Sequence, residues 1–215
     1  MSPIAVKLEN LKKTFKGTLI FENVTLELHE GRIYGFLGYN GSGKSVLFKI
    51  ICGFLRPDEG NVEVFGKKIG KDIDFPESTG VIIETPGFLE DYSAYRNLKF
   101  LASIRNDIHT EQIHKVLETV GLDSASKQPV KKFSLGMRQR LAIAQAIMEK
   151  PKLLILDEPF NGLDKQGVER MRNLLLDMKR SGTTMLLTSH MSEDIELLCD
   201  HRFEFNNKML EPVSS

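Results

Sequence analysis

The sequence predicts an α/β fold in which a mostly parallel β-sheet is joined to an N-terminal antiparallel β subdomain and a helical lobe. Strand-like segments fill the first third of the chain, and over residues 94–150 apolar residues instead recur every three or four positions. Two nearly continuous apolar runs follow at residues 152–159 and 183–190, with a helical pattern between them at 166–182. Such runs suit parallel strands buried on both faces, so these segments predict a βαβ unit after the lobe.

The first third is predicted to contain four strands and one helix. Residues 5–11, 24–28 and 32–38 alternate or run apolar, and residues 60–66 form a strand bounded by glycines. The helix, residues 44–55, begins where a glycine-rich loop ends and stops before a turn that contains proline and glycine.

The middle of the chain is predicted to form the helical lobe. Residues 94–104, 111–122 and 136–150 each show apolar positions at helical spacing. No internal repeat, low-complexity tract or domain linker separates these segments from the rest. We therefore expect a single domain over residues 1–215, with a lobe of roughly residues 88–150 inserted into the α/β core.

The composition is that of a globular protein with balanced charge. Of 215 residues 41% are apolar, and 29 Lys and Arg offset 29 Asp and Glu, which argues against a surface that coats nucleic acid or anionic lipid. Cys52 and Cys199 lie in apolar surroundings without a metal-binding pattern, so we expect buried thiols. No run of about 18 apolar residues occurs, and we expect a soluble, cytoplasmic protein that is able to dock on a membrane protein.

A glycine-rich loop at residues 38–45, GYNGSGKS, fits the pattern G-x-x-x-x-G-K-[ST]. Its glycines let backbone N–H groups face phosphate oxygens, while Lys44 and the N-terminus of the next helix add positive charge. Ser45 would place its hydroxyl on Mg²⁺. A flexible turn that matches by chance is the alternative, but it leaves the flanking strand and helix unexplained. The loop predicts a P-loop NTPase core that holds a nucleoside triphosphate through Gly38, Asn40, Gly41, Ser42, Gly43, Lys44 and Ser45.

The apolar run LLILDEP, residues 153–159, ends in two adjacent acids, Asp157 and Glu158. Buried strands normally exclude acids, so acids at a strand end indicate a function there. Asp157 would hold the Mg²⁺ shell, and Glu158 would orient, or accept a proton from, the water that attacks the γ-phosphate. The alternative is that both acids are simply solvated where the strand ends.

Together with the glycine-rich loop and the two acids, nearly the whole chain resembles the ATP-binding cassette family, the nucleotide-binding subunits of ABC transporters. The family's signature typically reads LSGGQ; here residues 133–137 read FSLGM, in which Ser134 and Gly136 are kept. The segment NGLD, residues 161–164, resembles the family's D-loop, and the resemblance implies that Asp164 belongs to the nucleotide site.

Two more site residues are implied by the resemblance. The segment LLTSH, residues 186–190, resembles the switch region, which implies that His190 contacts the γ-phosphate, although a lone histidine after a strand is ordinarily a surface or core residue. Phe15, between two early strands, resembles the aromatic residue that stacks on adenine, with core packing as its alternative.

The chain departs from the family pattern at Glu84 and Leu135. Most members carry glutamine where Glu84 stands in GVIIETPGF, and a glutamate there could bind Mg²⁺ more strongly or repel ATP. Leu135 replaces a glycine and should stiffen the start of the helix that Ser134 is predicted to cap. IIETPGFLEDYSAYRNL together with FSLGMRQRLAIA resembles the branch associated with export of, or immunity to, bacteriocins, lantibiotics and bacitracin-like peptides.

The resemblance implies a Mg²⁺-dependent ATPase that acts as a head-to-tail dimer with a second copy or a homologous cassette. ATP would lie between the phosphate loop of one subunit and Ser134 and Gly136 of the other. The subunit would drive a separate transmembrane permease from the inner face of the cell membrane, with no nucleic acid partner. Residues 88–95, FLEDYSAY, are the candidate docking surface; alternatively, these aromatics close the lobe's own core.

Two other functions would also use a phosphate loop. A soluble ATPase of the same superfamily acting on DNA or ribosomes is disfavoured, because such relatives carry long coiled coils between the nucleotide motifs or two cassettes in one chain. A P-loop kinase of small molecules leaves SLGMRQR and His190 unexplained. The transporter subunit is therefore the preferred interpretation.

Overall fold

The computed structural model describes residues 2–84, 87–105, 108–189 and 192–213. In these parts of the chain the strands form one sheet of four strands and one of six. The predicted α/β fold, with a mostly parallel sheet, an antiparallel β subdomain and a helical part, is confirmed.

The four-stranded sheet is antiparallel and comes from the N-terminal part of the chain. Its strand order is β2-β1-β4-β5. The strands are β1 (Ile4–Phe15), β2 (Thr18–His29), β4 (Glu59–Val64) and β5 (Lys67–Lys68). Their buried side chains, among them Leu8, Phe21 and Val62, share a core with those of residues 47–52, so this sheet covers the helix that follows the glycine-rich loop.

The six-stranded sheet is parallel from β9 to β6, and its order is β10-β9-β3-β8-β7-β6. The strands are β3 (Ile33–Leu37), β6 (Thr79–Ile82), β7 (Leu153–Leu156), β8 (Thr184–Thr188), β9 (His201–Asn206) and β10 (Met209–Pro212). Every residue of β7 and β8 is buried, as continuous apolar runs require. The carboxyl ends of β3, β6, β7 and β8 therefore meet at one edge of the sheet.

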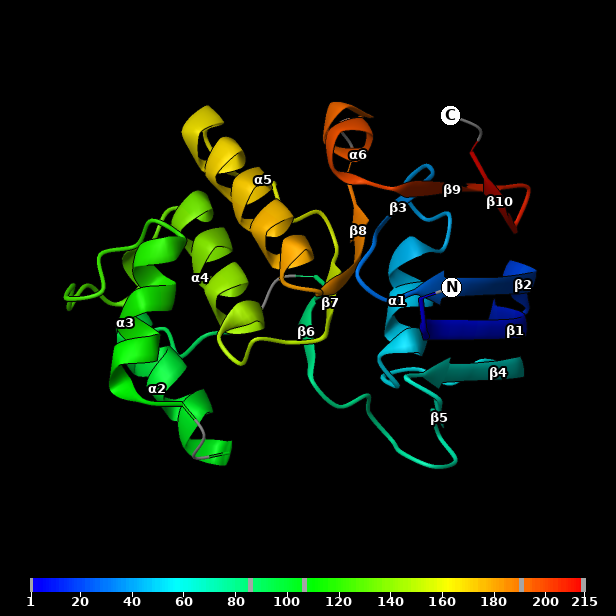
Figure 1. The fold of residues 1–215 in the computed structure, drawn as a ribbon, viewed down its shortest axis with the longest axis horizontal. Coiled ribbons are helices and arrows are strands. Elements are labelled where there is room, and N and C mark those ends of the chain that lie inside the picture. The colour runs from blue at the N-terminus through cyan, green and yellow to red at the C-terminus, as the bar shows by residue number, and fades with distance from the viewer. Residues whose placement is uncertain (1, 85–86, 106–107, 190–191, 214–215) are drawn as a thin grey trace.

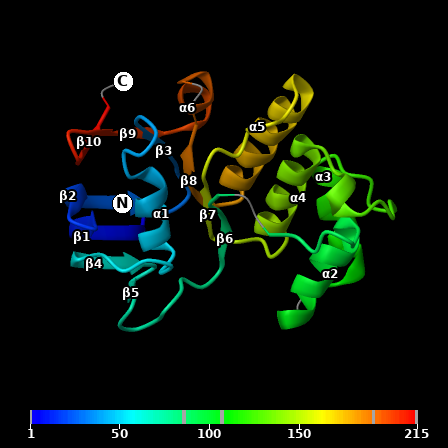
Figure 2. The same cartoon turned by 180° about the vertical axis from the view of Figure 1, so that it is seen from behind.

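The described part of the chain contains six α-helices and one 3₁₀ turn. They are α1 (Lys44–Ile51), α2 (Ala94–Arg105), α3 (Thr110–Thr119), the 3₁₀ turn Val130–Lys132, α4 (Leu135–Ile147), α5 (Lys165–Arg180) and α6 (Ser192–Leu198). Figure 1 shows α2, α3 and α4 together at the end of the molecule opposite the four-stranded sheet, and Figure 2 shows the same separation from behind. The helix α5 joins the parallel strands β7 and β8, which confirms the predicted βαβ unit.

The predicted elements differ from the structure at several ends and at the C-terminus. The strands β1 and β2 are longer than the predicted segments 5–11 and 24–28, and α3 and α4 each end three residues before the predicted helices do. The first helix was expected to run to residue 55, but α1 ends at Ile51, because Gly53 takes a left-handed conformation (φ 78°) and a Cβ there would lie 2.0 Å from a backbone oxygen. The helix α6 and the strands β5, β9 and β10 were not predicted. Only Phe205 of β9 is buried, so this strand lacks the apolar run that marks β7 and β8.

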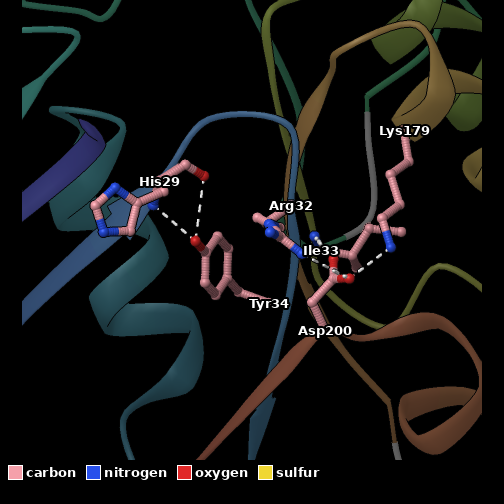
Figure 3. Close-up of polar contacts among 6 residues, drawn as sticks. All are labelled: His29, Arg32, Ile33, Tyr34, Lys179 and Asp200. Carbon is pink, nitrogen blue, oxygen red and sulfur yellow. Dashed lines mark hydrogen bonds and ion pairs between the residues drawn. The ribbon is translucent and has the colours of Figure 1, made fainter. Parts of the chain in front are cut away.

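The strand β3, which leads into the glycine-rich loop, is fixed at its start by polar contacts (Figure 3). Asp200 accepts hydrogen bonds from the Ile33 N–H (2.8 Å) and from the Lys179 ammonium (2.6 Å). Burial alone would raise the pKa of Asp200, but these two hydrogen bonds, together with the positive charges of Lys179 and Arg32, outweigh it and hold the pKa below its usual value. Next to them, the Tyr34 hydroxyl accepts from the His29 N–H at 2.6 Å. These bonds tie the strand to α5 and β2.

Both cysteines are sequestered. Cys52 is buried and Cys199 partly so. Burial raises the pKa of each thiol to about 12, which leaves both protonated at neutral pH. The expectation of buried thiols is confirmed for Cys52, whereas Cys199 is only partly buried.

Candidate nucleotide-binding site

The glycine-rich loop connects β3 to α1 in a conformation that needs its glycines. Gly38, Gly41 and Gly43 have φ angles of 140°, 83° and 114°, a region that side chains rarely adopt. A Cβ on Gly38 would lie 2.6 Å from the Ser42 hydroxyl, and one on Gly43 would lie 3.0 Å from the ring of Phe21. The loop is therefore closed on itself and packed against the antiparallel sheet.

Lys44 folds back into this loop. Its ammonium donates to the carbonyl oxygens of Gly38 (2.7 Å) and Tyr39 (3.1 Å). Burial lowers the pKa of Lys44, and the charges of Glu158 and Asp157 oppose this effect. The loop thus holds a cation in a partly desolvated position, where it acts strongly on an anion.

The two acids follow β7, next to α1 and β8. Ser45 donates its hydroxyl to Asp157 Oδ2 at 2.5 Å, and Thr188 donates to Asp157 Oδ1 at 2.7 Å. Thr188 Oγ1 also accepts from the Glu158 N–H at 2.9 Å. Glu158 has a φ of 52°, so the chain leaves the extended conformation of β7 here.

A pocket of about 820 Å³ lies in front of these groups. It gathers most of the predicted site residues: Asn40, Gly41, Gly43, Lys44, Ser45, Glu84, Asp157 and Glu158. Gly38 and Ser42 belong to the same loop but do not line it. The Ser42 hydroxyl is buried without a hydrogen-bond partner among the described residues. An anion in the loop would be a partner for such a group.

Glu84 follows β6 and turns toward α1. Its φ of 63° is left-handed, and its carboxylate pairs with the Lys49 ammonium at 2.5 Å. The Glu84 side chain remains 68% exposed and lines the pocket. The residue that departs from the family's usual glutamine thus contacts the phosphate-loop helix.

The signature segment begins α4 and lies on the D-loop segment of the same chain. Ser134 caps the helix by accepting a hydrogen bond from the Met137 N–H (3.2 Å), which confirms its predicted capping role. A Cβ on Gly136 would lie 2.6 Å from the Gly162 carbonyl oxygen, so this helix start and Gly162 are in close contact. Leu135 is 66% exposed and lines the pocket; Ser134 and Gly136 do not.

Three other predicted residues lie outside the pocket lining or outside the described chain. Asp164 caps α5 and accepts from Arg140 at 2.7 Å. Phe15 ends β1 with 42% exposure, and the Lys13 ammonium lies 5.3 Å from its ring centre, so Phe15 is not buried in the core. His190 falls outside the described residues.

Sequence reasoning missed Thr188, Lys49 and Gln139. Gln139 donates to the Pro159 carbonyl oxygen at 2.9 Å and so links α4 to the segment that carries Glu158. Thr188 stands in the LLTSH segment and could have been noticed there. Nothing in the local pattern marks Lys49, because its partner Glu84 is 35 residues away.

The sequence matches a known protein family over most of its length. The sequence model of a family described as ABC transporter matches residues 21–161, a stretch that includes the phosphate loop and both acids. The chain belongs to the ABC transporter family. It carries the ATP-binding domain of that family, as the sequence motifs predicted.

Relatives of this ABC ATP-binding chain come from several bacteria. It is 43% identical to the ABC transporter ATP-binding protein YybJ of Bacillus subtilis, over 96% of this chain and 94% of that protein. It is 40% identical to the bacitracin transport ATP-binding protein BcrA of Enterococcus faecalis, with 91% of this chain matched to 64% of BcrA, so it spans less than two thirds of that relative. The lantibiotic transport protein SrtF of Streptococcus pyogenes is 38% identical over 91% of this chain and 84% of SrtF.

Solved structures of ATP-binding cassettes have the same fold. An ATP-binding subunit of an ABC transporter superposes with a TM-score of 0.85 at 25% identity, covering 96% of this chain and 88% of the other. A dimeric cassette bound to ADP and phosphate gives a TM-score of 0.85 at 22% identity, covering 98% and 99%. In the described part of the ABC chain no helix is long and apolar enough to cross a membrane.

Proposed function

We propose that this chain hydrolyses ATP with Mg²⁺ and thereby drives a separate membrane permease. The contact that carries the proposal is the hydrogen bond from Ser45 to Asp157, because it joins the start of the phosphate-loop helix to the acid at the end of β7. Lys44 lies in the adjoining loop, and Glu158 is the next residue after Asp157. This is the set of groups that phosphoryl transfer to water requires.

The residues present suit Mg²⁺. Nucleotide-bound Mg²⁺ takes one or two protein oxygens and completes its shell with phosphates and waters. The Ser45 hydroxyl and the Asp157 carboxylate are hard oxygen donors that already converge. When bound, the metal would neutralise charge on the phosphates. Glu158 would orient the attacking water and accept its proton, and we assign His190 to the γ-phosphate and Phe15 to the adenine.

The full site would need two subunits. Ser134 and Gly136 do not line the pocket of their own chain, and Ser134 is exposed at the start of α4. A second cassette, placed head to tail, would receive the N–H groups of this helix start at its own bound triphosphate. Asp164, which caps α5 beside this segment, would lie near the shared boundary.

Residues 88–95 are our candidate for the permease contact. Phe88 and Tyr95 pack against the core, whereas Leu89 and Tyr92 are 50% and 38% exposed. The same segment is tied to α4, because Glu90 accepts two hydrogen bonds from Arg138, at 2.7 and 2.8 Å. A permease that moves this segment would therefore act on the signature helix.

The cargo class is inferred from relatives. The names of BcrA and SrtF refer to bacitracin and lantibiotic transport. We propose that this chain serves export of, or immunity to, an antimicrobial peptide or drug, as a peripheral subunit on the inner face of the cell membrane. No observation favours the soluble alternative that acts on DNA or ribosomes.

Two substitutions test the proposed roles. Lys44→Ala should abolish ATP binding, because it removes the loop's cation. Glu158→Gln should keep ATP bound but slow hydrolysis by about a hundredfold or more, because an amide cannot accept the proton. Phosphate release and nucleotide titration separate the two effects, and Lys71→Ala, at an exposed loop lysine, is the control. Hydrolysis at the control's rate in either variant would contradict the assignment.

A further inference from the structure

The ion pair between Lys49 and Glu84 lies where two hollows of the molecule meet. Glu84 lines the nucleotide pocket, and both residues line a second groove of about 600 Å³ between β6 and the helices α2 and α4. Lys49 does not line the nucleotide pocket. We propose that Lys49 is a positioning residue that holds the Glu84 carboxylate on the groove side, away from the triphosphate; this inference rests on the proposed ATP site.

The helix α1 provides the geometry. Lys49 follows Ser45 by four residues, so both side chains lie on one face of the helix. Ser45 contacts Asp157 and Lys49 contacts Glu84, each at 2.5 Å. These two acids follow the neighbouring parallel strands β7 and β6, where Leu156 lies opposite Ile82. One helix face thus holds the acids of two adjacent strands.

Charge explains why the position of Glu84 matters. Three carboxylates, those of Glu84, Asp157 and Glu158, line the pocket into which a triphosphate would enter. A glutamate that is free to turn inward would add repulsion that a glutamine would not. Lys49 supplies a cation that pairs with this additional carboxylate and holds it in place. The pair is 33% and 68% exposed, so its contribution is to position the carboxylate rather than to stabilise the fold.

The test is a double-mutant cycle read out as ATP affinity. Lys49→Met frees the carboxylate, so metal-free ATP, titrated in EDTA, should bind roughly three- to tenfold more weakly. The loss should be smaller with Mg²⁺, since the metal complex carries less negative charge. In a Glu84→Gln background, Lys49→Met should cost about twofold or less, because no carboxylate can then turn inward. Lys49→Arg, which keeps a cation at this position, should retain the wild-type affinity for ATP.

Controls separate positioning from a structural role. Lys67→Met breaks a similar exposed ion pair, with Glu77 at 3.0 Å, whose members do not line the pocket, and it should leave ATP affinity unchanged. Tm should stay near the wild-type value in Lys49→Met. An equal penalty for Lys49→Met with Glu84 and with Gln at position 84 would overturn the inference alone. Failure of the wild-type chain to bind ATP would overturn the proposed function and, with it, this inference.

Discussion

Thr188 hydrogen-bonds to both acids of the site and is completely buried. Thr188→Val keeps the shape of the side chain but leaves the Asp157 oxygen and the Glu158 N–H without this partner. Unsatisfied buried groups cost about 1–3 kcal/mol, so the free energy of unfolding should fall by that amount. Hydrolysis should fall about tenfold to a hundredfold, because Glu158 is no longer held. Urea denaturation and a phosphate-release assay measure the two effects.

A hydroxyl alone should be enough at this position. Thr188→Ser keeps the donor and acceptor and loses only a methyl group, so its hydrolysis rate should stay close to that of the wild type. Full activity in Thr188→Val would show that the acids are oriented by other contacts. The serine variant also reports how much of the loss in stability comes from the methyl group.

At the scale of elements, Asp58 joins β1 to the start of β4. Its carboxylate accepts from the Lys13 ammonium at 2.7 Å and from the Thr14 hydroxyl and N–H, both at 2.6 Å. The Lys13 hydrogen bond first, and then those of Thr14, lower the pKa of Asp58 from 3.8 to about 2. A lowered pKa means that the stabilisation is fully present above 3.8 and is lost as the pH falls through about 2.

The difference in stability between the wild type and Asp58→Asn should therefore become smaller in acid. The variant should unfold at a lower urea midpoint at pH 7, and the difference in midpoint should shrink as the pH falls from 3.8 toward about 2. Urea curves at several pH values measure this. A gap that stays constant through the same range would show that the carboxylate's charge does not hold the two strands together.

Contiguous patterns in the sequence predicted the phosphate loop and the strand that ends in Asp157, because each is fixed by residues adjacent in the chain. Contacts that depend on strand order could not be predicted in this way. Thr188 reaches Asp157 because β8 lies beside β7, and Lys49 reaches Glu84 because β6 ends near α1. The strand β9 was missed since only one of its residues is buried and it lacks an apolar run.

At the scale of the whole molecule, a single chain presents the signature helix to the outside. Ser134 is exposed at the start of α4, while the phosphate loop of the same chain faces a pocket that Ser134 does not line. In the proposed function the loop and this helix start are therefore two separate surfaces, each of which would contact a triphosphate. Two copies placed head to tail would bring the loop of each against the helix start of the other.

A pair of substitutions at Ser134 tests this arrangement with the cap preserved. Asp and Asn are both good N-caps and differ by one charge. In a Glu158→Gln background with ATP, we expect a dimer by light scattering. Ser134→Asn should keep the dimer, whereas Ser134→Asp should leave monomers, because its carboxylate would face the neighbour's γ-phosphate. Dimers of equal population in both variants would show that the signature segment does not meet the triphosphate. Monomers in both would indicate that the hydroxyl itself is required.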